Sequence, residues 1–341
     1  MTYSSRFFLY APLTLFLLLA AGVGVYWWHV AGALSARLDA LNGREAMPGV
    51  TLVFKSKTVA GFPFNIDVVF DDLNVTVKTP HGPSSWSAEK FAMHALTYGR
   101  DQVLFEAAGR QLLGWTDLKG VRHIMPFEVG AMHASAIDGA QGLSRIDLDV
   151  MGFGSPALTA ARVQLHARVA PTGDAIDLFA TVDGVHLSPR LTSLFGSDLS
   201  SIKLDARAVP GRSFQGLRAG RVDWVGAMEA WRLANGALQV DDLELSWDRL
   251  SAMGRGALSL GEDHGVRGYL DFKVAGIATL IATAERRRVQ GAPNAGIAAA
   301  LLDRAAKAGA GETGMLGAVL GFHDGVVSVG DEKATTAEPL Y

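Results

Sequence analysis

Residues 7–28 form an apolar run without a charged side chain, and this run constrains the chain more than any other feature. At about 1.5 Å per residue, a helix of this length would measure roughly 33 Å, enough to cross a hydrocarbon core of about 30 Å. The sequence therefore predicts a single transmembrane anchor at 7–28. It leaves a stub at 1–6 on one side and the bulk of the chain on the other.

The flanking charges indicate an orientation for this anchor. Arg6 precedes the span without an acidic neighbour, whereas the following flank mixes both signs, which favours a cytoplasmic N-terminus and an exported body. The alternative is a cleaved signal peptide, for which the small residues at 20–22 would suit a peptidase. The apolar run continues to Trp27 and Trp28, and paired tryptophans suit a membrane–water interface, so a retained anchor is favoured.

Composition excludes several classes of function. Without Arg6 the chain carries 30 basic and 34 acidic residues, a net charge near −4, which is no footprint for nucleic acid. Cysteine is absent, so disulfides, thiolate nucleophiles and cysteine-ligated metals are impossible. The 39 glycines fit a fold with many turns between strands.

Alternation of apolar and polar residues with a period of two recurs along the body and predicts strands with one wet face. The alternating segments are 66–70, 73–77, 146–150, 163–169, 176–182, 202–208, 243–247, 258–260 and 266–274. Short turn signals join several of them, including Asp71-Asp72 in the first hairpin. The predicted fold class is mainly β: an antiparallel meander that curls into an open groove or a flattened barrel.

Helices are expected in fewer places. Residues 30–41 should continue the anchor helix, 189–196 should form a short helical turn, and 277–289 and 294–308 show one apolar helical face each. The predicted organisation is a juxtamembrane helix and linker at 29–48, a β-rich domain at 49–330 and a loose tail at 331–341. Within the β-rich domain, a break near 209–230 would divide two sub-lobes.

Three stretches resemble a known bacterial family. They are AGFPF at 60–64, the run from Trp231 to Leu270 containing WRLANGALQVDDLELSW, GRGALSL and GVRGYLDF, and DGVVSVG at 324–330. With the N-terminal span, they resemble the family known as domain of unknown function 2125. Its strand pattern is similar to that of AsmA-like envelope proteins. The resemblance implies an inner-membrane anchor, a periplasmic β-groove and a role in binding or conducting lipid.

Candidate lipid-contacting positions are the inward residues of the clearest strands, with a closed core as the alternative interpretation. These positions are Leu243, Leu245, Trp247, Leu258, Leu260, Leu270 and Phe272. Arg286, Arg287 and Arg288 end an amphipathic helix, where they either complement the helix C-terminus or contact lipid headgroups. Gly61, Phe62 and Pro63 mark either a strand bend or a groove mouth near the membrane.

No catalytic or cofactor pattern stands out. The nine histidines show no metal-ligand spacing, and GAGETG at 309–314 lacks the preceding strand that a dinucleotide loop requires. We therefore expect no enzyme activity, no cofactor and no metal. The expected partner is membrane lipid, and the alternative is a scaffold that recruits another envelope protein through exposed sheet edges.

Overall fold

The computed structural model describes residues 5–99, 101–189, 196–277, 297, 300, 301, 304 and 315–341. The helices are α1 (Ser5–Leu41), the 3-10 turn η1 (Gly211–Phe214), α2 (Gln215–Arg218) and α3 (Trp224–Leu233). The strands are β1 (Arg44–Met47), β2 (Val50–Val53), β3 (Ser56–Ala60), β4 (Asn65–Thr79), β5 (Gly82–Leu96), β6 (Gln102–Thr116), β7 (Arg122–Gly139), β8 (Gly142–Gly154), β9 (Leu158–Val169), β10 (Ile176–Leu187), β11 (Asp198–Val209), β12 (Ala237–Trp247), β13 (Leu250–Leu260), β14 (Val266–Ala275), β15 (Met315–His323), β16 (Val326–Val329) and β17 (Glu332–Thr336).

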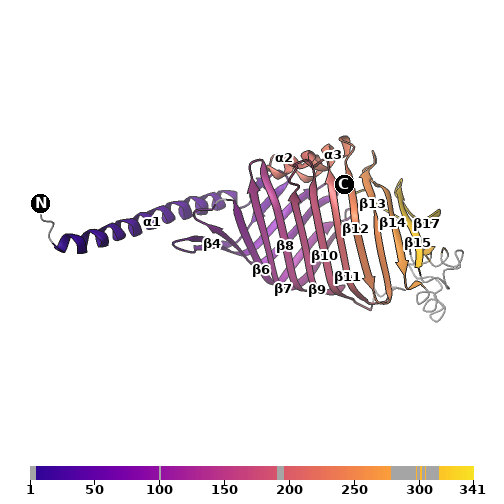
Figure 1. The fold of residues 1–341 in the computed structure, drawn as a ribbon, viewed down its shortest axis with the longest axis horizontal. Coiled ribbons are helices and arrows are strands. Elements are labelled where there is room, and N and C mark those ends of the chain that lie inside the picture. Colours follow the sequence, from indigo (N-terminus) through magenta and orange to yellow (C-terminus); the bar gives the residue numbers. More distant parts are fainter. Residues whose placement is uncertain are drawn as a thin grey trace.

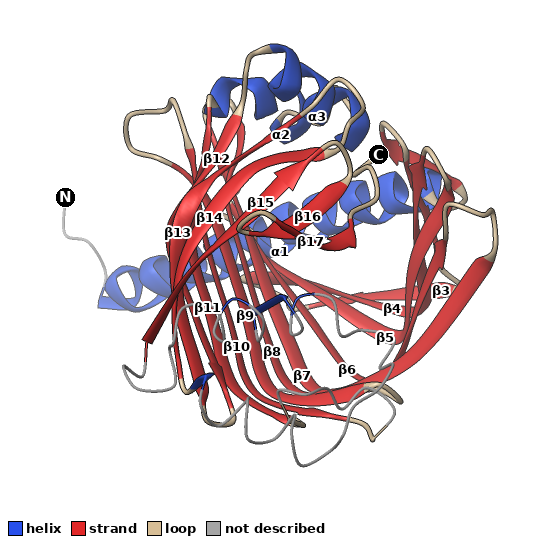
Figure 2. Cartoon of the chain, turned by 90° about the vertical axis from the view of Figure 1, so that its right-hand side faces the viewer, coloured by secondary structure: helices blue, strands red, loops and turns tan. Residues whose placement is uncertain are grey.

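All described strands belong to one antiparallel sheet. From β4 to β17 each strand pairs with the next along the chain, while β2 and β3 pair with the two halves of β4 and β1 pairs with β2. Successive strands lie side by side along the long axis of the molecule (Figure 1), and a view along that axis shows the sheet curled into a trough (Figure 2). The predicted fold class, an antiparallel meander that curls, is confirmed.

Helix α1 has two parts with different surroundings. Its apolar part projects away from the sheet (Figure 1), and Tyr10–Leu41 contains the one window among the described residues that is long and apolar enough to span a membrane. Its last turns pack through Val30, Leu34 and Leu38 on a buried cluster centred on Val68. The expected continuation of the anchor helix over 30–41 is therefore confirmed.

Polar contacts fix the end of α1 to the sheet. Asn42 donates through Nδ2 to the backbone oxygen of Phe54 and accepts through Oδ1 from the Phe54 amide, each at 3.0 Å. Lys57 forms an ion pair with Asp39 on the helix, and its ammonium lies 5.9 Å from the centre of the Phe54 ring. The helix and the first strands consequently form one packed unit.

The Asp71-Asp72 pair does not form the predicted turn. Strand β4 runs through it, and both halves pair with β5, through Asp71–Lys90 and Leu73–Ala88. Asp72 adopts a positive φ of 50°, and the pairing register with β5 is the same on both sides of it. This irregularity keeps Phe70 and Leu73 on the same face although they are three residues apart.

Two expected features of the organisation are wrong. No break separates two lobes near 209–230, because β11 and β12 pair from Leu199–Trp247 to Val209–Ala237 and the intervening residues form η1, α2 and α3 beside the sheet. The tail at 331–341 is not loose, since Glu332–Thr336 forms β17 and Tyr341 packs against Met228 and Trp231 of α3. The linker expected at 29–48 also contains β1.

The expected helical segments at 189–196, 277–289 and 294–308 lie almost entirely outside the described residues. Of the last two, Ile277, Ile297, Ala300, Leu301 and Arg304 are described.

We predict that Asn42→Ala destabilises the protein by about 1–3 kcal/mol, because it removes both bonds to the backbone of buried Phe54. Denaturant unfolding in detergent measures this loss. Asn42→Asp keeps an acceptor for the Phe54 amide and should lose less. Equal stability of wild type and Asn42→Ala would show that the Asn42 hydrogen bonds do not hold the helix end.

Candidate functional site

One face of the sheet carries apolar side chains in continuous cross-strand rows, and we call it the apolar face. The first row is Ile66, Ala95, Val103, Ala136, Ile146, Ala167, Leu178, Ala206, Val240, Gly256, Leu270, Leu320 and Val329. The second row is Val59, Val68, Met93, Phe105, Ala134, Leu148, Leu165, Ala180, Leu204, Leu243, Gly254, Phe272 and Ala318. The third row is Phe70, Phe91, Ala107, Met132, Val150, Val163, Val182, Ile202, Leu245, Ala252, Val274 and Leu316.

These rows run along the molecule rather than across it. Each member is the direct partner of the next, so a row advances by one inter-strand spacing of about 4.8 Å per strand. From β4 to β15 a row therefore covers about 50 Å, and no charged residue interrupts it. The result is a continuous apolar strip that leads away from the end of the sheet on which α1 packs (Figure 1).

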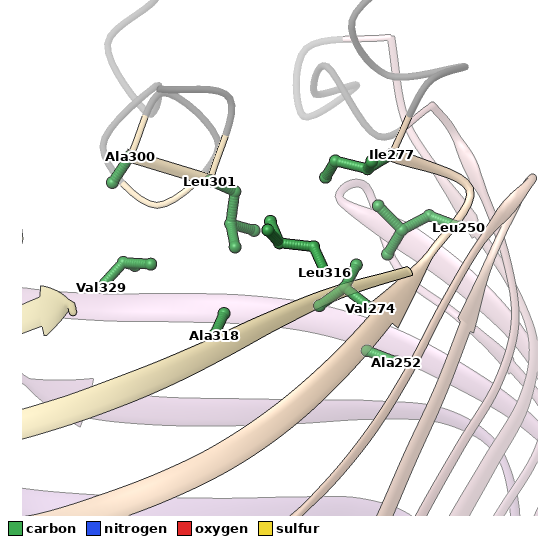
Figure 3. Packing of buried hydrophobic residues seen from close by; sticks show 9 residues of the cluster. All are labelled: Leu250, Ala252, Val274, Ile277, Ala300, Leu301, Leu316, Ala318 and Val329. Carbon is green, nitrogen blue, oxygen red and sulfur yellow. The ribbon is translucent and has the colours of Figure 1, made fainter. Parts of the chain in front are cut away.

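The two ends of the apolar face are covered. At one end, the last turns of α1 pack over the cluster that includes Ile66 and Phe70. At the other end, Ile277 and Leu301 pack against residues of β13 to β15 in a cluster shown in Figure 3. The members of that cluster are Leu250, Ala252, Val274, Ile277, Ala300, Leu301, Leu316, Ala318 and Val329.

The middle of the apolar face is open to solvent. Ile146 on β8 is 40% exposed and its diagonal neighbour Leu165 on β9 is 41% exposed, although both belong to the apolar rows. Alanines accompany them in the rows at 134, 136, 167 and 180, so side chains there are short. An apolar molecule lying on this stretch would contact Ile146 and Leu165 above the short alanine side chains, and no part of the fold would have to move.

All seven positions predicted for lipid contact lie on the apolar face. Leu243, Leu245, Leu270 and Phe272 belong to its rows, and Trp247, Leu258 and Leu260 continue the same side of β12 and β13. Leu270 is buried at 6% exposure within a packed cluster, and the other six are half-buried. These strands thus form the more covered part of the face, whereas the open part lies on β8 and β9.

The open part of the apolar face was not among the predicted site residues. Ile146, Leu148 and Leu165 show the same alternation as the other strands, so periodicity identifies their face. Periodicity cannot tell which section of a face another segment covers. A cluster of alanines on neighbouring strands was the signal that could have distinguished this section.

The other predicted positions fall in different places. Gly61, Phe62 and Pro63 form the connection between β3 and β4, and Phe62 packs edge-on against Trp27 of α1 with ring centres 5.5 Å apart. The connection therefore lies beside the apolar helix. Arg286, Arg287 and Arg288 lie outside the described residues.

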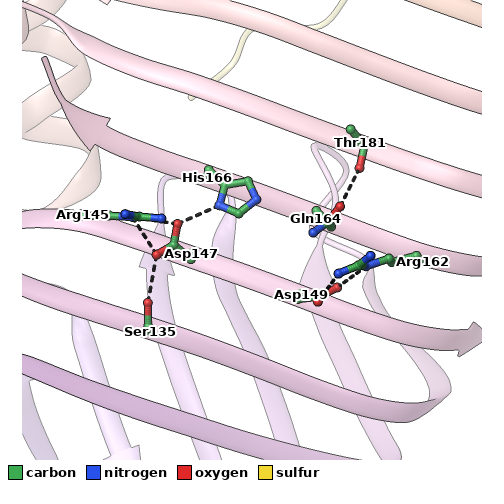
Figure 4. A network of polar contacts seen from close by, with 8 residues as sticks. All are labelled: Ser135, Arg145, Asp147, Asp149, Arg162, Gln164, His166 and Thr181. Carbon is green, nitrogen blue, oxygen red and sulfur yellow. Dashed lines mark hydrogen bonds and ion pairs between the residues drawn. The ribbon is translucent and has the colours of Figure 1, made fainter.

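The opposite face of the sheet is polar and held by ion pairs (Figure 4). Arg162 donates two hydrogen bonds to Asp149, at 2.8 and 2.7 Å, and these bonds lower the pKa of the Asp149 carboxyl. Burial opposes the charge of Asp147, yet its hydrogen bonds with His166, Arg145 and Ser135 leave its pKa below the ordinary value. This face is exposed to solvent, and its charged side chains make it unsuitable for binding apolar ligands.

The depressed pKa of Asp149 predicts a pH dependence of stability. The ion pair with Arg162 contributes fully above the carboxyl's ordinary pKa of 3.8 and is lost as the pH falls through the lower folded-state value. Asp149→Asn should therefore be less stable than wild type at neutral pH, with the gap closing toward about pH 3. Thermal unfolding midpoints at both pH values measure this.

Arg162→Gln is the matched variant, because it keeps the carboxylate and removes its partner. Like Asp149→Asn, it should lose less stability than wild type when the pH is lowered from neutral to about 3. If Asp149→Asn lost as much stability on acidification as wild type, the ion pair would not be a source of the pH dependence.

The described residues contain no group of three or more His, Asp or Glu side chains that could hold a metal ion. One open hollow of about 590 Å³ lies beside α1, lined by Trp27, Trp28, His29, Ala31, Gly32, Ala33, Ser35 and Val59. Val59 is the first member of the second apolar row, so this hollow adjoins the start of the apolar face.

The fold and its two faces define a class: a mainly β protein with one apolar N-terminal helix and a curled meander that is apolar along its full length on one side. Within this class, the chain belongs to the bacterial family described as "Uncharacterized protein conserved in bacteria", domain of unknown function 2125, whose model matches residues 27–333. The predicted family is thereby confirmed. Among curated proteins, none matches the sequence. The further likeness to AsmA-like envelope proteins stays a prediction.

Proposed function

We propose that this protein is a membrane-anchored envelope protein that holds lipid acyl chains on the apolar face of its sheet and passes them along it. The observation that carries the proposal is the set of uninterrupted apolar rows, which remain open to solvent at Ile146 and Leu165. A closed core would bury central side chains such as Ile146 and Leu165, which are 40% and 41% exposed here.

The energetics favour an acyl chain as the occupant. Removing each methylene from water gains about 0.8 kcal/mol, so a chain of ordinary length laid along the rows gains several kcal/mol without any polar recognition. A continuous strip of about 50 Å exceeds the length of one acyl chain, which allows a chain to slide without leaving the apolar surface. Side chains of moderate size, without donors or charges, suit a ligand recognised by shape alone.

The proposal includes a retained anchor, with Arg6 on the cytoplasmic side and the sheet in the periplasm. Its support is the charge asymmetry around 7–28 and the apolar part of α1, which projects away from the sheet (Figure 1). We also propose that the protein performs no chemistry, because the apolar face, as far as the described residues form it, offers hydrocarbon contact and no arrangement of nucleophile and base.

The alternative scaffold function receives less support. It requires exposed sheet edges that can pair with a partner, yet β17 is five residues long and carries Glu332 and Lys333, and β3 is equally short. Short, charged edge strands disfavour pairing with another chain.

We predict that Leu165→Asp reduces co-purified lipid about tenfold or more while the protein stays folded. Leu165 is exposed enough for the new carboxylate to reach water in the empty protein, but a bound acyl chain would bury it at a cost of several kcal/mol. Mass spectrometry of organic extracts from gently purified protein measures the lipid, and thermal unfolding of the same preparation measures the fold. Leu270 is unsuitable for this test because it is buried.

Leu104→Asp is the matched control, since Leu104 is 46% exposed and lies on the polar face of β6 between Val103 and Phe105. It should leave the lipid content unchanged. Equal lipid content in both variants, or no lipid in the wild type beside a recurrent protein partner, would contradict lipid binding and favour the scaffold.

A further inference from the structure

Two connections at the α1 end of the sheet expose large apolar side chains together. Phe62 and Phe64 follow β3, and Leu96 and Tyr98 lie at the end of β5; their exposed fractions are 61%, 62%, 45% and 73%. We call these four residues the aromatic tip. The amide and the hydroxyl of Thr97 both donate to the backbone oxygen of Phe64, at 2.9 and 2.8 Å, so the two connections are joined.

The aromatic tip is bound to one level of α1. Trp27 donates through Nε1 to the backbone oxygen of Asn65 at 2.7 Å, and Tyr26 donates through its hydroxyl to the backbone oxygen of Thr97 at 3.2 Å. Phe62 adds the edge-on ring contact with Trp27. Both connections are therefore held against the same turn of the helix.

The backbone of the first connection requires glycine for this approach. Gly61 has a φ of +98°, and a Cβ there would lie 2.7 Å from the backbone oxygen of Asn65, the atom that accepts from Trp27. The tight turn thus serves to present Phe62 and Phe64 at the helix.

That turn of α1 lies where the uncharged run ends. Residues 7–28 lack charge, and Trp27 and Trp28 close the run, so a bilayer around this run would place its interface at this level. Aromatic rings are stabilised at a membrane–water interface, while four exposed apolar side chains on one tip are unfavourable in water.

We propose that the aromatic tip lies in the membrane interface, so that the sheet sits directly on the bilayer surface and its apolar face begins there. The hollow lined by Trp27, Trp28 and Val59 lies at the same level and adjoins the second apolar row. An acyl chain leaving the bilayer would then meet the apolar face without crossing water. This inference rests on the membrane anchoring in the proposed function and not on lipid being carried.

Site-directed spin labelling tests the inference cleanly, because the natural chain has no cysteine. Single-cysteine variants Phe64→Cys and Tyr98→Cys would be labelled in the full-length protein and reconstituted in vesicles of phosphatidylethanolamine and phosphatidylglycerol. Electron paramagnetic resonance then compares relaxation by oxygen, which concentrates in lipid, with relaxation by a water-soluble nickel chelate. We expect both labels to collide more with oxygen than with the chelate.

Two reference positions decide the outcome. Met253 is 59% exposed on β13, far along the sheet, so a label at Met253→Cys should collide more with the water-soluble chelate. A label at Leu17→Cys in α1 should collide more with oxygen, as in the bilayer interior. Labels at 64 and 98 that match Met253 while Leu17 lies in lipid would overturn the inference and leave the anchor standing. A label at Leu17 in water would overturn the anchor and the inference together. Lipid binding is measured separately, by the lipid content of Leu165→Asp.

Discussion

The structure depends on every strand of a long antiparallel series turning its apolar side chains to the same side of the sheet. A shift of one residue in any strand would turn its apolar side chains to the solvated side and end the apolar rows. The chain preserves this arrangement with local irregularities. Between Val240 and Leu243 on β12, the pairing register with β13 shifts by one residue at two aspartates, and both apolar residues therefore stay on the apolar face.

The same device recurs at the α1 end of the sheet. On β5 the register with β6 shifts between Ala88 and Phe91, whereas Asp71 and Asp72 separate Phe70 from Leu73 on β4 without changing the register with β5. Each bulge bends its strand and increases its local twist, which is how a long meander curls rather than staying flat. The shift on β12 lies between the first and the second apolar row, so it keeps both rows on one face, whereas the shift on β5 lies beyond the third row.

This explains what sequence analysis could and could not predict. The long apolar N-terminal helix and the apolar side of the strands follow directly from composition and period, and the seven predicted positions on β12 to β14 share one face. A pair of acidic residues between apolar ones suits a turn as well as an irregularity within a continuous strand, and at Asp71-Asp72 the strand continues. The pairing partner β5 decides between them, and that contact is not local in sequence.

Other differences have similar causes. Helix α3 was missed, although Asp223 caps it by accepting from the Gly226 amide at 2.8 Å, a signal present in the sequence. The docking of Tyr341 depends on a surface that α3 and β12 build together, where its hydroxyl donates to Glu229 at 3.0 Å. Hydrogen bonds from Arg232, together with the contact from Tyr341, hold the pKa of Glu229 at about 2. Contacts of this kind order the C-terminal segment, although its polar composition alone suggests a loose tail.

The central claim is that one continuous face of the sheet contacts lipid. The most direct measurement is photo-crosslinking in living cells, with a benzophenone amino acid placed at Phe105, Leu165 or Leu204, which share the second apolar row. Leu104 and Met253, exposed on the polar face, provide the comparison. We expect lipid adducts at all three row positions and none at the two positions on the polar face. Adducts restricted to protein, or lipid adducts equally frequent on both faces, would contradict it.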